Sequence, residues 1–175
     1  MIRIQWAKSV MENEEGMNHL WLRLPADPHI RTMDITVELP PGMFRSPNLN
    51  GYPEDTSGVA RVNRGGPELD LLYEIYTVQA VPCGEADLLI RLRCIDIDGK
   101  SREYMRQAKL LLSADPCLVP EIDEEVAERV KSLAAPLDES SPLSENGSDA
   151  WQVVVPRVDA SGELSEWERK YRVDG

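Results

Sequence analysis

Residues 86–112 constrain the fold of this chain more than any other stretch, because they predict a long β-hairpin with one register. Asp98-Gly99 is a strong hairpin turn signal. A two-residue turn would mix apolar and charged residues on one face of the hairpin. A three-residue loop of Ile97, Asp98 and Gly99, with Gly99 at positive φ, pairs Asp96 with Lys100 instead.

With the three-residue loop, charge complementarity and burial agree along the hairpin. On one face, opposite charges pair, as in Arg93–Glu103 and Asp87–Lys109. On the other face, apolar residues pair, as in Leu92–Tyr104 and Leu88–Ala108. Arg106, opposite Ile90, is the one residue that does not fit the apolar face. Cys94 lies on that face, so we expect it to be buried.

Alternation of apolar and polar residues predicts further strands in the first 113 residues. Half-buried strands are expected at 2–6, 20–24 and 33–39, a weaker one at 59–62, and a central strand at 71–81. With the hairpin this gives about seven strands, joined by Pro- and Gly-rich turns. The pattern favours a mainly β fold, an antiparallel immunoglobulin-like β-sandwich, over an α/β fold.

The same run of strands resembles bacterial immunoglobulin-like modules. The likeness lies in the Leu39-Pro40-Pro41-Gly42 strand exit and in the late strand pair from Gly84 to Gly99. The resemblance implies the sandwich architecture.

Residues 40–58 form a long connection between two predicted strands, and their prolines, glycines and Asn50-Gly51 turn argue against regular structure. Long loops inside a compact domain are often functional. This one contains Phe44, which is the only phenylalanine, and Tyr52. The two aromatics either fold back over the end of the sandwich or form an exposed binding tip.

After residue 115 the pattern changes from strand to helix. Residues 121–134 place Ile122, Val126, Val130 and Leu133 on one stripe, with acids early and bases late. The stripe either packs on the sandwich or docks on a partner protein. Residues 1–115 are therefore the predicted sandwich domain and residues 116–134 an appended acidic amphipathic helix.

The remaining residues predict a linker and a short terminal element. Residues 135–149 combine Pro, Ser, Gly and Asn with four acids and no base, which is typical of a flexible linker. Residues 152–158 predict a strand within a C-terminal segment, 150–175, that is either a hairpin or a strand followed by a short helix. Residues 158–167 resemble the last strand pair of a fibronectin type III domain.

The whole chain has a formal net charge of −12, and most of this negative charge lies in one segment. Residues 113–149 contain ten acids and two bases, whereas the rest is close to neutral. This distribution argues against nucleic acid or an anionic membrane surface as a partner. No apolar run is long enough to span a membrane, and no secretory signal follows Met1, so we expect a cytoplasmic protein if Met1 is the natural start.

The search for catalytic and metal-binding patterns yields few candidates. His19 and His29 are the only histidines, no nucleophile elbow, HExxH or phosphate-binding loop is present, and the three cysteines predict reduced structural thiols. Asp96 and Asp98 lack the later ligands of a calcium loop. The acidic clusters at 12–15 and 123–125 are most simply solvated faces, and Arg61 and Arg64 beside Gly65-Gly66 are a weak anion signal.

These observations predict a non-catalytic protein-interaction module, such as an adaptor or accessory subunit, without a cofactor. The expected interface residues are Phe44, Tyr52, Ile122, Val126, Val130 and Leu133. Homo-oligomers through strand edges or the acidic helix are a further expectation. The alternatives are an immunity or inhibitor protein that binds a basic target, a small metal-dependent hydrolase, and a carbohydrate-binding protein that uses Trp21, Trp151 or Trp167.

Overall fold

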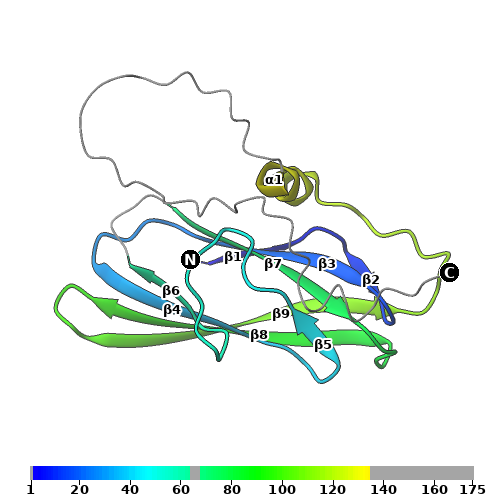
Figure 1. Ribbon diagram of the computed structural model, residues 1–175, viewed down its shortest axis with the longest axis horizontal. Coiled ribbons are helices and arrows are strands. Elements are labelled where there is room, and N and C mark those ends of the chain that lie inside the picture. Colours follow the sequence, from blue (N-terminus) through cyan, green and yellow to red (C-terminus); the bar gives the residue numbers. More distant parts are fainter. Residues whose placement is uncertain (1, 64–67, 135–175) are drawn as a thin grey trace, which may run out of the picture. The chain divides into compact units, whose positions relative to one another are not determined.

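The computed structural model describes residues 2–63 and 68–134. The described part is a sandwich of two β-sheets with one helix on the outer side of one sheet (Figure 1). Its elements are β1 (Arg3–Trp6), β2 (Val10–Glu12), β3 (Met17–Leu24), β4 (Ile30–Glu38), β5 (Met43–Arg45), β6 (Ala60–Asn63), β7 (Leu69–Thr77), β8 (Gly84–Asp96), β9 (Ser101–Ser113) and α1 (Glu124–Ala134). The predicted mainly β, immunoglobulin-like sandwich is confirmed.

The two sheets contain four and five strands. The four-stranded sheet has the order β1-β3-β7-β5, and the five-stranded sheet has the order β2-β9-β8-β4-β6. Their inner faces supply one apolar core, which includes Leu20, Leu22, Met33, Ile35, Leu71, Tyr73, Ile75, Leu88 and Ile90. Period-two alternation along each strand therefore sends every second side chain into the space between the sheets.

The β8–β9 hairpin has the register that the sequence predicts. Leu92 pairs with Tyr104, and Arg93 pairs with Glu103. The Asp96 amide donates to the Lys100 carbonyl at 3.0 Å, and Gly99 has a φ of 81°. The three-residue loop with a left-handed glycine is thus confirmed.

The chain crosses from one sheet to the other between β1 and β2. Fully buried Asn18 holds this crossing, because its side chain accepts a bond from the Lys8 amide at 2.9 Å and donates to the Lys8 carbonyl at 2.8 Å. Beyond the crossing, β2 pairs in parallel with the end of β9, from Leu111 to Ser113. The sequence pattern did not predict β2.

The long connection after β4 is more ordered than the sequence suggests. The prediction of no regular structure is wrong at β5, which pairs with β7. Arg45 donates to Glu54 at 2.9 Å, with both side chains largely buried, and Asn48 donates to the same carboxylate at 2.7 Å. Burial alone would raise the pKa of Glu54, but the bonds from Asn48 and Arg45 outweigh it and hold this pKa below its ordinary value.

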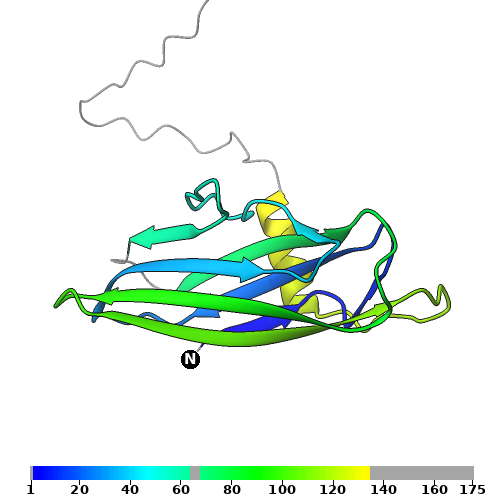
Figure 2. The same cartoon turned by 90° about the horizontal axis from the view of Figure 1, so that it is seen from below.

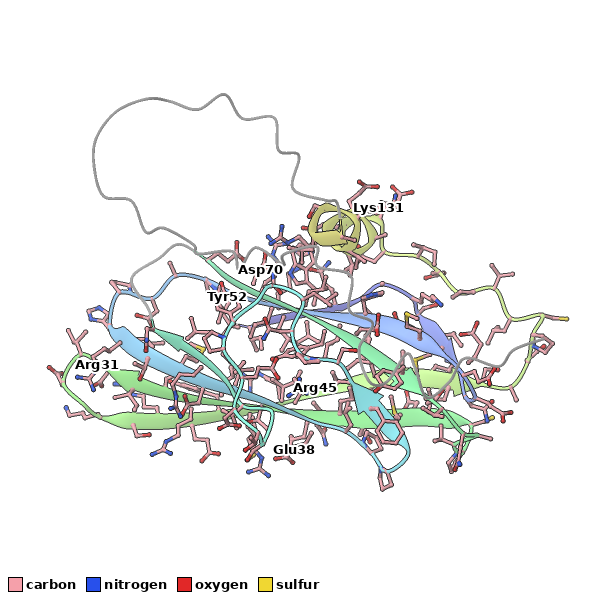
Figure 3. All side chains as sticks on the ribbon, in the orientation of Figure 1. Arg31, Glu38, Arg45, Tyr52, Asp70 and Lys131 are labelled. Atoms are coloured by element: carbon pink, nitrogen blue, oxygen red, sulfur yellow. The ribbon has the colours of Figure 1, made fainter. Side chains whose placement is uncertain are left out.

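Helix α1 lies on the outer face of the four-stranded sheet and begins after Asp123, whose carboxylate accepts the Glu125 amide at 3.0 Å. Val126 is fully buried against Trp21 and Leu72. Charged side chains flank this contact, including a 2.7 Å ion pair between Arg129 and Asp70. In Figure 3, Asp70 lies beneath the helix and Lys131 points away from the sheet. No helix in the described ranges is long and apolar enough to span a membrane.

Candidate interaction site

The outer side of β9 is open along most of its length (Figure 2). On this side of β9, strand β2 pairs only with residues 111–113, and no strand of the described part lies beside residues 101–109. Residues 101–107 are all exposed, in contrast to the alternating burial of the other long strands. We call residues 101–109 the β9 edge.

The turn geometry shows which backbone groups point outward from the β9 edge. Because Asp96 and Lys100 form a hydrogen-bonded pair, the alternation of an antiparallel ladder directs the even-numbered residues of β9 toward β8. The amides and carbonyls of odd-numbered residues such as 103, 105 and 107 then face the open side. Ser113 agrees with this parity, since its carbonyl accepts the Asn13 amide on that side at 3.0 Å.

A groove runs beside the β9 edge, into the space between the sheets, with a cavity volume of about 370 Å³. Its lining includes the core residues Met33 and Leu92 and the more exposed residues Ile2 and Tyr104. Tyr104 faces inward opposite Leu92, yet 45% of its surface is exposed. We call this cavity the edge groove.

Two arginines stand on the groove-facing side of the β9 edge. Arg102 is opposite Cys94 and lies 3.9 Å from Asp96, a long ion pair. Arg106 is opposite Ile90, and its guanidinium donates to the Met105 carbonyl at 3.0 Å. No ion pair to a carboxylate of the described part engages Arg106. The misfit of Arg106 in the predicted hairpin was the sequence signal of this open edge, although the site itself was not predicted.

The two predicted interface aromatics of the long loop lie in different environments. Tyr52 is half-buried and packs against the main core. Phe44 is 47% exposed, and its ring stacks on Tyr76 with 5.8 Å between centroids. Tyr52 therefore folds back over the sandwich, which is the first of the two alternatives for these aromatics, whereas Phe44 is exposed at the surface.

The predicted stripe of α1 is divided between buried and exposed positions. Val126 is buried, and Val130 and Leu133 pack beside it against the sheet. Ile122 precedes the helix and is 53% exposed. Of the two alternatives for the stripe, the structure supports packing on the chain's own sandwich.

The remaining candidate residues have local partners or lie outside the described residues. Trp21 is buried under α1, so its predicted role as an exposed sugar-binding aromatic is wrong; Trp151, Trp167, Arg64 and the C-terminal segment are not described. Arg61 pairs with Asp34 at 2.8 Å. The Asp96 side chain accepts the Asp98 and Lys100 amides in the hairpin turn. Within 2–63 and 68–134, no cluster of His, Cys, Asp or Glu has the arrangement of a metal site.

Comparison with known proteins yields similar folds only. No family model and no curated protein matches the chain. Domains D2 and D3 of the major pilin SpaD from Corynebacterium diphtheriae align with 61% of this chain at 8% identity and a TM-score of 0.47. The chain spans about half of that pilin fragment, 51% of its length.

Two other solved structures show the same general likeness. Self-complemented MyfA, the major subunit of Myf fimbriae from Yersinia enterocolitica, aligns with 63% of this chain and 98% of its own, at 7% identity and a TM-score of 0.38. The periplasmic chaperone SfaE aligns with 67% of this chain and 60% of its own, at 11% identity and a TM-score of 0.39. The likeness concerns the fold, and we transfer no residue role from it.

Proposed function

We propose that this chain is a non-catalytic protein-interaction module, an adaptor or accessory subunit, which binds an extended segment of a partner protein along the β9 edge. Within residues 2–63 and 68–134, no strand covers the outward backbone groups of residues 101–109, and this open row carries the proposal. A strand with unpaired amides and carbonyls is a template for another strand, and side-chain pockets beside it add specificity.

The dimensions of the site suit an extended segment. Residues 101–109 offer a length of roughly 30 Å, at about 3.3 Å per residue. An added strand would continue the line of β2, which already occupies the same side of β9 at residues 111–113. Its groove-facing side chains would cover Tyr104 and the apolar floor of the edge groove.

The charge of the edge favours an acidic partner segment. The edge contains Arg102, Arg106 and Lys109 with Glu103 as the only acid, and Lys100 directly precedes it. The chain as a whole has a net charge of −12. Lys109 is paired with Glu85 at 2.9 Å, which leaves the arginines as the main positive groups facing a ligand. Such complementarity accelerates encounter and selects the partner.

A proline substitution tests the proposal. Peptides are selected from a randomised library on the full chain, and their binding is measured with Met105→Pro and Met105→Ala. The Met105 amide faces the open side, so proline removes a donor to the ligand and no bond to β8. We expect Met105→Pro to abolish binding and Met105→Ala to retain it, with similar melting temperatures for both variants.

Hydrogen exchange supplies a second measurement on the same complexes. Bound peptide should protect the amides of residues 103, 105 and 107, which face the open side in the free protein. Failure to select any peptide, or selection of peptides that bind Met105→Pro as tightly as the parent chain, would contradict the proposal.

A further inference from the structure

We infer that the segment bound at the β9 edge carries a carboxylate opposite Arg106 and an apolar residue two positions away, opposite Tyr104. This inference rests on the proposed function and names the chemistry of the partner. Directly opposite residues of paired strands point to the same face of the sheet. Because Arg106 and Tyr104 both face the groove side, the partner residues opposite them must face it as well.

The carboxylate follows from the position of Arg106. A strand laid over the edge would remove water from the Arg106 guanidinium, whose one hydrogen bond in the described part is to the Met105 carbonyl of its own strand. An apolar residue opposite it would leave a poorly solvated charge without a partner. A carboxylate would instead form a charge-assisted hydrogen bond with the guanidinium.

The apolar position follows from the groove beside Tyr104. In the partner segment, the residue two positions from the carboxylate would also face the groove. Its side chain would contact the exposed Tyr104 ring and the groove floor formed by Leu92 and Met33. Burial of an aliphatic side chain there is favourable because the floor is already apolar. Arg102, two residues further, is partly neutralised by Asp96 at 3.9 Å and so requires a carboxylate less than Arg106 does.

A second copy of this chain cannot satisfy Arg106 through the same edge. Glu103 is the only acid in residues 101–109, and it lies on the opposite face from Arg106. If two β9 edges paired antiparallel with Tyr104 of one copy opposite Tyr104 of the other, Arg102 of each copy would lie opposite Arg106 of the other. If Arg106 of one copy lay opposite Arg106 of the other, two like charges would face each other. Inward-pointing charges on an edge strand oppose such self-association, and a ligand carboxylate would overcome them selectively.

Two short peptides of identical composition test the inference. In Thr-Glu-Thr-Val-Thr-Glu-Thr both carboxylates share the valine face, and the symmetric pattern places one of them opposite Arg106 in either strand direction. In Thr-Thr-Glu-Val-Glu-Thr-Thr both carboxylates lie on the other face. We expect the first peptide to bind the full chain roughly tenfold more tightly than the second, with a preference that weakens at high salt.

Variants of Arg106 show whether this residue is the selector. Arg106→Gln should remove the preference between the two peptides, and Arg106→Glu should favour a peptide in which lysines replace both glutamates. Arg106 is exposed, so both variants should keep the melting temperature of the parent chain. Arg93→Gln, on the opposite face of the hairpin, is the matched control and should keep the preference.

The outcomes separate this inference from the proposed function. If both peptides bind equally and Met105→Pro abolishes both, the edge binds strands without this selectivity, and the inference is overturned. If Arg106→Gln keeps the full preference, Arg106 is not the selector, and the inference is overturned as well. Peptides that bind independently of Met105→Pro would overturn the proposed function itself.

Discussion

At the scale of single residues, His19 shows how the sandwich perturbs a titratable group. The side chain is half-buried on the outer face of the four-stranded sheet, with its Nε2 4.0 Å from a Glu74 carboxylate oxygen. Burial lowers the pKa of His19 below 6.5, and the Glu74 charge offsets only part of this effect. The folded protein therefore favours neutral His19.

This shift predicts a pH dependence of stability. Between the lowered folded pKa and the unfolded value of 6.5, the unfolded chain binds more protons, so the free energy of unfolding falls as pH decreases through that window. We expect His19→Gln to lose less stability than the parent chain between about pH 7.5 and pH 5.5. Urea unfolding at both pH values measures this difference. Exposed His29→Gln is the control, and equal pH slopes for His19→Gln and the parent chain would contradict the prediction.

At the scale of elements, the β8–β9 turn depends on one backbone conformation. Gly99 has a φ of 81°, and a Cβ built on it meets nothing within 4 Å. Any cost of substitution therefore comes from backbone strain and not from steric contact. We expect Gly99→Val to lower the free energy of unfolding by about 1–2 kcal/mol.

Asparagine is the matched control at this turn, because it tolerates the left-handed region better than a β-branched residue. Gly99→Asn should lose less stability than Gly99→Val in urea unfolding. A valine variant as stable as the asparagine variant would show that the turn relaxes out of the left-handed conformation.

Helix α1 gives a second prediction at this scale. Val126→Asp places a carboxylate on the buried contact with Trp21 and Leu72, so we expect a loss of about 2–5 kcal/mol of stability. Ile122→Asp, at an exposed position outside the helix, should change stability little. Thermal unfolding of the two variants distinguishes them. An unchanged melting temperature for Val126→Asp would mean that the helix face is open to a partner.

The sequence predicted the elements that are specified by nearby residues. It did not predict the elements that form only by pairing with strands distant in the chain. The hairpin could be assigned pair by pair, because turn chemistry and cross-strand charge both lie within 27 residues. Strands β2 and β5 span three residues each, too short for a periodic signal, and exist because β9 and β7 offer pairing sites. Trp21 alternates with the core residues Leu20 and Leu22 along β3, but the helix that buries it begins about a hundred residues later in the chain.

At the scale of the whole molecule, the described residues all belong to one compact unit. Prolines, small residues and unbalanced acids in 135–149 favour protease access. We expect limited proteolysis to cut within 135–149 and leave a product that contains α1. Protection of this segment would contradict the prediction.

Truncation adds a stability comparison. We expect a 1–115 fragment to fold, since it contains every described strand, but to be less stable than a 1–137 fragment because it uncovers Trp21 and Leu72. Melting temperatures of the purified fragments measure the difference. An insoluble 1–115 fragment would show that the helix is required for folding.

The β9 edge depends on how all the strands are arranged, so the sequence pattern did not predict it. The sequence predicted an interface in the long loop and in α1 instead. The edge is open because no strand of the described part lies on that side of β9, and no local pattern of residues indicates a missing neighbour. Phe44 and the stripe of α1 stood out as apolar residues without evident cover, yet the chain itself supplies cover for most of the stripe. The only sequence signal of the site was Arg106, a charged residue on the apolar face of the predicted hairpin, opposite Ile90.

The short parallel pair of β2 and β9 has a mechanical consequence. Tension applied to the chain before β2 and after β9 would draw these two strands in opposite directions along their length, so their hydrogen bonds would carry the load together in shear. The β1–β3 pair is antiparallel and would open one bond at a time under a pull on its free end. The backbone bonds from Ser9 to Glu121 and from Asp123 to Ala7 join the same two parts of the chain, so they would share this load with the β2–β9 pair.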